Sequence, residues 1–190
     1  METLGTDPDR ARKIEVVAYD AAWPHLFAAQ EARIRTALGA AALLVEHVGS
    51  TSVPGLRAKP VIDIQLAVRD SAQENRYRPA LEQAGYRLIV REPEWFEHRL
   101  FKGAVPETNL HVFSFGCAEL DRCRLFRDWL RVSAEDLALY ASTKEQLASR
   151  DWAHVQDYAN AKQGVISEIL ARAEAWQQRR FPPAPPPANR

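Results

Sequence analysis

Two apolar segments joined by a loop of small residues constrain this chain more than any other feature. Residues 43–48 and 61–68 are rich in Leu, Ile and Val, and their composition predicts two β-strands. In the second strand, alternation places Ile62 and Ile64 on one face, and Asp63 and Gln65 on the other. The order strand, turn, strand therefore brings backbone amides and hydroxyls near an acidic group.

The turn itself, Gly49-Ser50-Thr51, has the composition of a phosphate-binding loop. Glycine permits a positive φ and a close approach of the backbone to a ligand, and Ser50 and Thr51 add hydroxyls and amides for phosphate oxygens. Asp63 and Gln65 offer oxygen ligands to Mg²⁺, which would bridge to a triphosphate. On the residues alone, a simple turn beside a half-buried aspartate explains the pattern equally well.

Composition narrows the class of protein. The chain has 190 residues and a net charge of +0, with 46% hydrophobic residues, as expected of a globular protein that does not bind nucleic acid through bulk positive charge. Its apolar runs are too short to span a membrane, and its two cysteines fit no zinc or redox spacing. We therefore expect a cytoplasmic location, no membrane partner and reduced thiols.

The order of predicted elements indicates an α+β fold with a mixed sheet in the first two-thirds and a helical last third. We predict helices over 20–38, 71–84, 121–132, 133–149 and 152–179, and further strands over 86–91, 97–102 and 109–115. Residues 14–178 are expected to form one domain. A flexible leader, 1–13, precedes it, and a proline-rich, disordered tail, 179–190, follows it.

The segment Glu46–Ile64 closely resembles the signature of the GrpB family, which has a nucleotidyltransferase-like fold. Four further segments extend the resemblance over most of the chain: Asn109–Val112, Phe126–Arg131, Tyr140–Lys144 and Tyr158–Lys162. The resemblance implies a mixed sheet flanked by helices. It also implies Mg²⁺-dependent transfer of a nucleoside monophosphate from a nucleoside triphosphate to a hydroxyl group.

Carried over residue by residue, the resemblance assigns the turn to Gly49 and Ser50 and the first acid to Asp63. Gln65 stands where the wider superfamily has a second acid, and the later strand offers His111 in place of a third. Asp63 with Gln65 suits one cation whose shell is completed by substrate phosphates. A softer metal that accepts imidazole, and a metal-free site in which Lys or Arg replaces the cation, are open alternatives.

Lysines are the other candidate phosphate ligands. Lys144 and Lys162 each interrupt an apolar helical stripe, four residues after Tyr140 and Tyr158 respectively, and Lys59 precedes the Asp63 strand. A lysine on such a stripe must reach water, pair or meet an anion, so extension of its stem to solvent is the competing interpretation. His111 is a candidate base, and His47 is either a base, a ligand or a packed core residue.

Three functions are consistent with these residues. The first is nucleotidyl transfer with Asp63 and His111 as catalytic groups. The second is a catalytically inactive module that binds a nucleotide or another phosphorylated small molecule, as the missing second acid favours. The third is an accessory role in coenzyme A metabolism, because relatives of the resembled family occur fused to dephospho-coenzyme A kinase.

Overall fold

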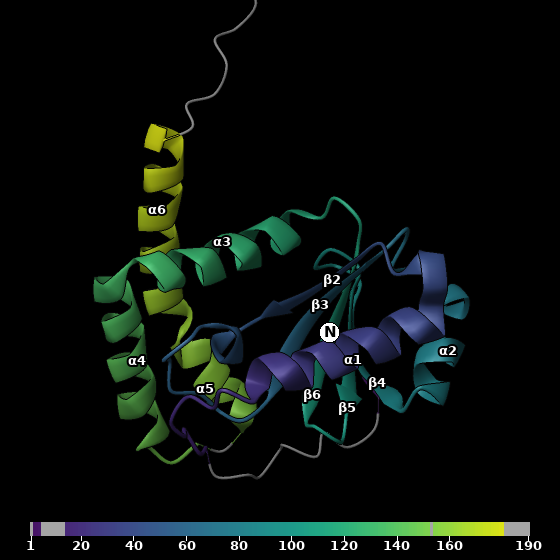
Figure 1. Cartoon of the computed structure of the whole chain (residues 1–190), viewed down its shortest axis with the longest axis horizontal. Coiled ribbons are helices and arrows are strands. Elements are labelled where there is room, and N and C mark those ends of the chain that lie inside the picture. The colour runs from purple at the N-terminus through teal and green to yellow at the C-terminus, as the bar shows by residue number, and fades with distance from the viewer. Residues whose placement is uncertain (1, 5–13, 153, 181–190) are drawn as a thin grey trace, which may run out of the picture.

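A single mixed β-sheet organises the molecule (Figure 1). The computed structural model describes residues 2–4, 14–152 and 154–180. Within these ranges the strand order is β1-β4-β5-β6-β3-β2, in which β3 and β6 pair in parallel and every other pair is antiparallel. The strands are β1 (Glu2–Thr3), β2 (Leu44–Val48), β3 (Ile62–Val68), β4 (Tyr86–Glu92), β5 (His98–Gly103) and β6 (Thr108–Ser114).

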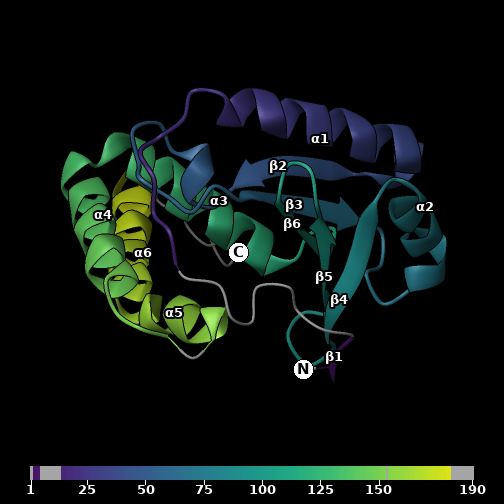
Figure 2. The same cartoon turned by 90° about the horizontal axis from the view of Figure 1, so that it is seen from below.

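Helices lie on both sides of the sheet. Figure 2 shows α1 along one side of β2 and β3, with α3 on the opposite side and α4, α5 and α6 gathered beside one end. The α-helices are α1 (Trp23–Leu38), α2 (Arg78–Gln83), α3 (Ala118–Val132), α4 (Ala134–Ala148), α5 (Val155–Ala161) and α6 (Gln163–Arg180). The α+β class, the mixed sheet and the helical C-terminal part are thus confirmed. No helix in the described ranges has the length and apolar character needed to cross a membrane.

The face of the sheet under α1 and α2 is the main hydrophobic core. The alternation predicted for β3 is confirmed, because Ile62, Ile64 and Leu66 all point into this layer and are buried. Trp23 and Ile34 of α1 pack against them. Burying such side chains provides most of the driving force for this layer.

The opposite face carries polar residues in register across several strands. Asp63 on β3 lies beside Asn109 on β6, which lies beside Lys102 on β5. Two residues further along the strands, Gln65 is beside His111, which is beside Leu100. The parallel β3–β6 pair therefore assembles side chains that are more than forty positions apart in the chain.

Two predicted helices are wrong in extent. The helix predicted over 71–84 is a 3₁₀ turn, η3 (Glu74–Arg76), followed by the short α2. Pro79 lacks the backbone N–H that helix interiors require, so the α-helix begins only just before it. The helix predicted over 152–179 is broken at Lys162 into α5 and α6, two residues before Gly164, which disfavours helix.

The remaining predicted elements are confirmed within a few residues. The Ser133 hydroxyl accepts a hydrogen bond from the Asp136 amide at the start of α4, as its cap-like sequence predicts. Cys117 and Cys123 are free thiols. Glu2–Thr3 of the expected leader pair with β4, whereas residues 5–13 and 181–190 of the expected leader and tail lie outside the described ranges.

Candidate functional site

A pocket on the polar face of the sheet collects most of the predicted site residues. Its volume is about 510 Å³. Its walls come from β3 to β6, from the turn after β2, from α4, and from the region where α5 meets α6. The lining includes Ser50, Thr51, Lys59, Asp63, His111, Lys144 and Lys162, all predicted from the sequence. Predicted residues from five separate segments thus meet in one cavity.

Gly49 brings the turn into contact with Asp63. It has a positive φ of 67°, and a Cβ atom placed on it would lie 2.2 Å from the Asp63 Oδ2. No side chain fits this position, and L-residues disfavour this φ as well. The Ser52 hydroxyl donates to the Gly49 carbonyl at 2.6 Å and holds the turn closed. The glycine is therefore required because the backbone and the carboxylate touch.

The two hydroxyl residues of the turn have different surroundings. The Lys144 Nζ donates to the Ser50 Oγ at 3.1 Å, which ties the turn to α4. The Thr51 hydroxyl donates to the Val61 carbonyl at 3.1 Å and lies 3.0 Å from the His47 Nε2. The Thr51 hydroxyl is thus engaged within the fold, while that of Ser50 is bound to a pocket lysine.

His47 is a packed residue of the opposite face. Its ring stacks on Phe27 of α1 with 4.8 Å between ring centroids, and burial lowers its pKa to about 4. It does not line the pocket. Among the roles open to His47 from the sequence, the structure supports the packed one.

Asn109 holds the carboxylate of Asp63. Its Nδ2 donates to the Asp63 Oδ1 at 2.7 Å, while its own Oδ1 is buried with no hydrogen-bond partner in the described structure. Gln65 shows a similar imbalance, because its Nε2 donates to the Glu119 carbonyl at 3.3 Å while its Oε1 is buried without a partner. Buried acceptors of this kind cost stability and are uncommon.

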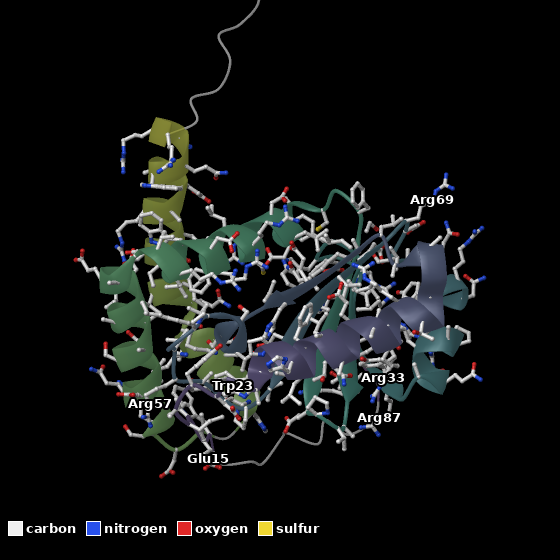
Figure 3. All side chains as sticks on the ribbon, viewed as in Figure 1. Glu15, Trp23, Arg33, Arg57, Arg69 and Arg87 are labelled. Carbon is white, nitrogen blue, oxygen red and sulfur yellow. The ribbon has the colours of Figure 1, made fainter. Side chains whose placement is uncertain are left out.

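Lys144 is almost completely removed from water, with a relative exposure of 2%. Besides the Ser50 hydroxyl, its ammonium contacts the Arg57 carbonyl and lies 4.8 Å from the centroid of the Tyr140 ring. Burial, followed by repulsion from Lys162, lowers its pKa to about 7. In Figure 3 the Arg57 side chain lies beside α4, where it pairs with Glu145 at 2.9 Å.

Lys162 occupies the break between α5 and α6. Its ammonium lies 4.5 Å from the centroid of the Tyr158 ring. The two Tyr-x-x-x-Lys segments, which share the same spacing, therefore make equivalent cation–π contacts. Burial lowers its pKa to about 8; Asp63 opposes this shift and Lys59 adds to it. The pocket therefore holds ammonium groups that repel one another and share the charge of one nearby carboxylate.

His111 is connected to two residues that the sequence interpretation did not select. Its Nδ1 lies 3.0 Å from the His98 Nε2, and the His98 Nδ1 lies 2.8 Å from the Glu92 Oε2. The second distance would suit an ion pair, but burial lowers the pKa of His98 to about 2, so this is a hydrogen bond of a neutral ring. Glu92, His98 and His111 all line the pocket.

Comparison with known proteins identifies the family. Residues 13–172 match the family described as GrpB protein. The chain belongs to the GrpB family. It is 53% identical over 173 residues to a UPF0157 protein of Halalkalibacterium halodurans, covering 91% of this chain and 89% of that one. The crystal structure of GrpB from Enterococcus faecalis superposes with a TM-score of 0.75 at 29% identity, covering 85% of this chain and 99% of that chain.

One relative is a larger enzyme. The GrpB-like chain is 30% identical over 189 residues to a protein named dephospho-CoA kinase in Mycolicibacterium paratuberculosis. The match covers 86% of this chain but only 46% of that protein. The shared region is therefore about half of the kinase, and the name describes that whole protein.

The donor set of this GrpB chain fits one divalent cation but not two. Among the described lining residues the carboxylates are Asp63 and Glu92, and Glu92 is bound to His98. The described residues contain no cluster of three His, Cys, Asp or Glu side chains that could hold a metal. Gln65, the second predicted ligand, does not line the pocket, and Asn109 presents its Nδ2 to Asp63, so a cation at Asp63 would need bound phosphates to complete its shell. Two adjacent Mg²⁺ ions would need more anionic oxygens than this.

Several pocket residues of the GrpB chain were missed from the sequence. Asn109 and Lys102 become visible only through strand register, and Glu92 and His98 only through the pairing of β4 with β5. Arg91 and Arg99, on the same two strands, bind Glu74 and lower the pKa of that carboxyl to about 2. A short-range signal existed only for Asn109, which lies two positions before His111 on a predicted strand.

Proposed function

We propose that the pocket binds the phosphate groups of a nucleotide or another phosphorylated small molecule. The observation that carries the proposal is the convergence of Lys59, Lys144 and Lys162 around Asp63. Lys144 is buried and Lys59 and Lys162 are half-buried, and ammonium groups placed near one another in this way are unfavourable without an anion. A bound phosphate would offset their repulsion and desolvation, which gives these lysines a role that the apolar stripes alone do not explain.

The size of the pocket supports the same ligand class. A volume of about 510 Å³ lies within the range of small-molecule and cofactor sites. Lys59, Lys144 and Lys162 lie with the turn and Asp63. The strands β4 and β5 and the loop between them contribute both apolar and polar lining residues: Val90, Glu92, Trp95, His98, Leu100 and Lys102. A ligand with phosphates at one end and a group with both apolar surface and hydrogen-bonding atoms at the other, such as a nucleotide, suits this lining.

Isothermal titration calorimetry with pyrophosphate, ATP, dephospho-coenzyme A and adenosine tests the proposal. We expect the three phosphorylated ligands to bind and adenosine to bind far more weakly. Lys144→Met and Lys162→Met should each weaken binding at least tenfold, on the order of 1.4 kcal/mol. Arg87→Met is the matched control, because Arg87 is an exposed cation of β4 that does not line the pocket (Figure 3). Equal losses in all three variants, or no binding by wild type, would contradict a specific phosphate site.

Nucleotidyl transfer is the second candidate, favoured by the contact of Gly49 with Asp63, which matches the turn and first acid of the resembled fold. In this role Asp63 would hold one Mg²⁺ with the substrate phosphates completing its shell, and the charge of the cation would stabilise those phosphates. The lysines would neutralise the pyrophosphate that leaves. The role of Asp63 differs between the two candidates and can therefore separate them.

Asp63→Asn decides between a metal-assisted reaction and metal-free binding. For binding without a cation, removing the negative charge should strengthen ATP binding, and Mg²⁺ should have little effect on either protein. For transfer, wild type with Mg²⁺ and a pool of hydroxyl acceptors should release pyrophosphate, and the variant should not. Stronger ATP binding by the variant without any turnover by wild type would exclude transfer and retain the binding function.

A further inference from the structure

Glu92, His98 and His111 form a continuous hydrogen-bonded chain that ends in the pocket. They lie on three neighbouring strands, β4, β5 and β6, and their contacts measure 2.8 Å and 3.0 Å. His98 is buried, and its ring stacks on Phe113 with 4.7 Å between centroids. The edge of Trp95 packs on the His98 ring at 5.0 Å. These contacts leave the His98 ring little freedom to turn.

In this series of hydrogen bonds, the donor and the acceptor of each bond can be assigned. The Glu92 carboxylate accepts a hydrogen bond from the His98 Nδ1, while burial raises the pKa of that carboxyl. His98 is neutral because burial lowers its pKa to about 2, and its Nε2 therefore accepts from the His111 Nδ1. Burial lowers the pKa of His111 as well, and a neutral ring that donates through Nδ1 has its lone pair on Nε2.

We propose that Glu92 and His98 are positioning residues that hold His111 in its Nδ1–H tautomer, so that its Nε2 accepts a hydrogen bond from a hydroxyl group of the ligand. Because His111 lines the pocket and its Nδ1 bonds His98, Nε2 is the nitrogen left for that hydroxyl. The inference rests on the proposed function, in that a phosphorylated molecule occupies the pocket. It adds that this molecule carries a hydroxyl group near the phosphates.

The location of His111 suits this role. It stands beside Gln65 on β3, two residues along the strand from Asn109 and hence from the Asp63 end where the lysines gather. A ribose or alcohol hydroxyl at His111 would therefore lie near phosphates held by those lysines. In a transfer reaction the hydroxyl proton would pass to the His111 Nε2. The oxygen would keep the electron pair and bond to phosphorus, while the bond to pyrophosphate breaks and its electrons leave with pyrophosphate.

Nitrogen-15 NMR of the imidazole rings in the full chain tests the tautomer without any ligand. We expect both His98 and His111 to carry their proton on Nδ1 at neutral pH, with the His111 signals identified from their loss in His111→Asn. A His111 ring that carries its proton on Nε2 would overturn the inference. This result would leave phosphate binding unaffected, so the two proposals can fail separately.

Two substitutions at position 98 separate positioning from simple packing. Gln in His98→Gln can still offer an oxygen to the His111 Nδ1, whereas His98→Phe keeps a ring to stack on Phe113 but offers no acceptor. We expect His98→Gln to retain the Nδ1–H tautomer of His111. His98→Phe should shift His111 toward the Nε2–H form. Identical His111 tautomers in both variants and wild type would show that His98 does not control the proton.

Ligand binding supplies a second readout. Wild type should bind ATP roughly fivefold to tenfold more tightly than 2′,3′-dideoxy-ATP, the range of one hydrogen bond. His98→Gln should keep this preference and His98→Phe should lose it, while pyrophosphate binds all three proteins equally. Loss of pyrophosphate binding in His98→Phe would show that His98 supports the whole site rather than the His111 proton, and would contradict its role as a positioning residue. An undiminished ATP preference in that variant, or no preference in wild type, would refute acceptance of the ligand hydroxyl by His111.

Discussion

The two faces of the sheet use the same strands for opposite purposes. On β3, Ile62, Ile64 and Leu66 enter a core sealed by α1 and α2, whereas Asp63 and Gln65 face the side that holds the pocket. The first face removes apolar surface from water and stabilises the fold. The second buries unpartnered amide oxygens and lysines with lowered pKa values, which cost stability. A fold tolerates such costs most often where a ligand offsets them.

The largest effect should come from damage to the apolar face. Ile64→Ala removes a fully buried side chain and should lower the free energy of unfolding by about 2–5 kcal/mol, measured by urea denaturation. Val132→Ala, at an exposed position, should change it by less than about 0.5 kcal/mol. Ile64→Ala protein that remains folded should bind pyrophosphate like wild type. Lost binding in folded protein would mean that the two faces are not separable.

A smaller loss of stability is expected from substituting Gly49, where the turn contacts Asp63 on the pocket face. Gly49→Ala places a methyl group against Asp63 and should cost about 1–3 kcal/mol more than Gly55→Ala. Gly55 has a similar positive φ of 78° but open space around it, so it controls for backbone strain alone. Phosphate binding should fall in Gly49→Ala only. Equal stability losses would show that the approach of Gly49 to Asp63 is unimportant.

The pH dependence of stability should distinguish the pocket lysines from ordinary surface lysines. The folded-state pKa of Lys144 is lowered to about 7 from the usual 10.5 of a lysine, so between these pH values the unfolded chain binds more protons. Stability therefore rises with pH in this window, by roughly 1 kcal/mol per pH unit for one lysine. Lys144→Met should remove this slope relative to wild type in denaturation curves from pH 7.5 to 9.5. Parallel profiles for the two proteins would contradict the lowered pKa.

The pH dependence of ligand affinity should be the smallest of these effects. Its sign is opposite to that of the pH dependence of stability. Lys144 and Lys162 lose their protons at about pH 7 and 8, whereas an anionic ligand favours their charged forms. ATP binding should therefore weaken severalfold between pH 7.5 and 9, because binding requires protons to be taken up. Calorimetry in two buffers of different ionisation enthalpy would measure that uptake directly. Affinity that is independent of pH, with no proton uptake, would remove the lysines from the site.

Local pattern was sufficient to predict much of the site. The alternation in 61–68 placed Asp63 opposite the core, and helical spacing placed Lys144 among buried residues, as the structure confirms. Both signals depend on residues within one or two turns of each other. The break at Lys162 was missed because the apolar stripe continues across it, so periodicity alone does not reveal the change in helix direction.

The class of the fold, the two-faced character of β3 and the family to which the chain belongs could all be predicted before folding was considered. These properties depend on short-range periodicity and on a continuous motif from Glu46 to Ile64. The contact of Asn109 with Asp63, and the series that joins Glu92 and His98 to His111, are visible in the folded protein alone. Such contacts depend on the register of strands that meet only after folding, and no local pattern encodes that register.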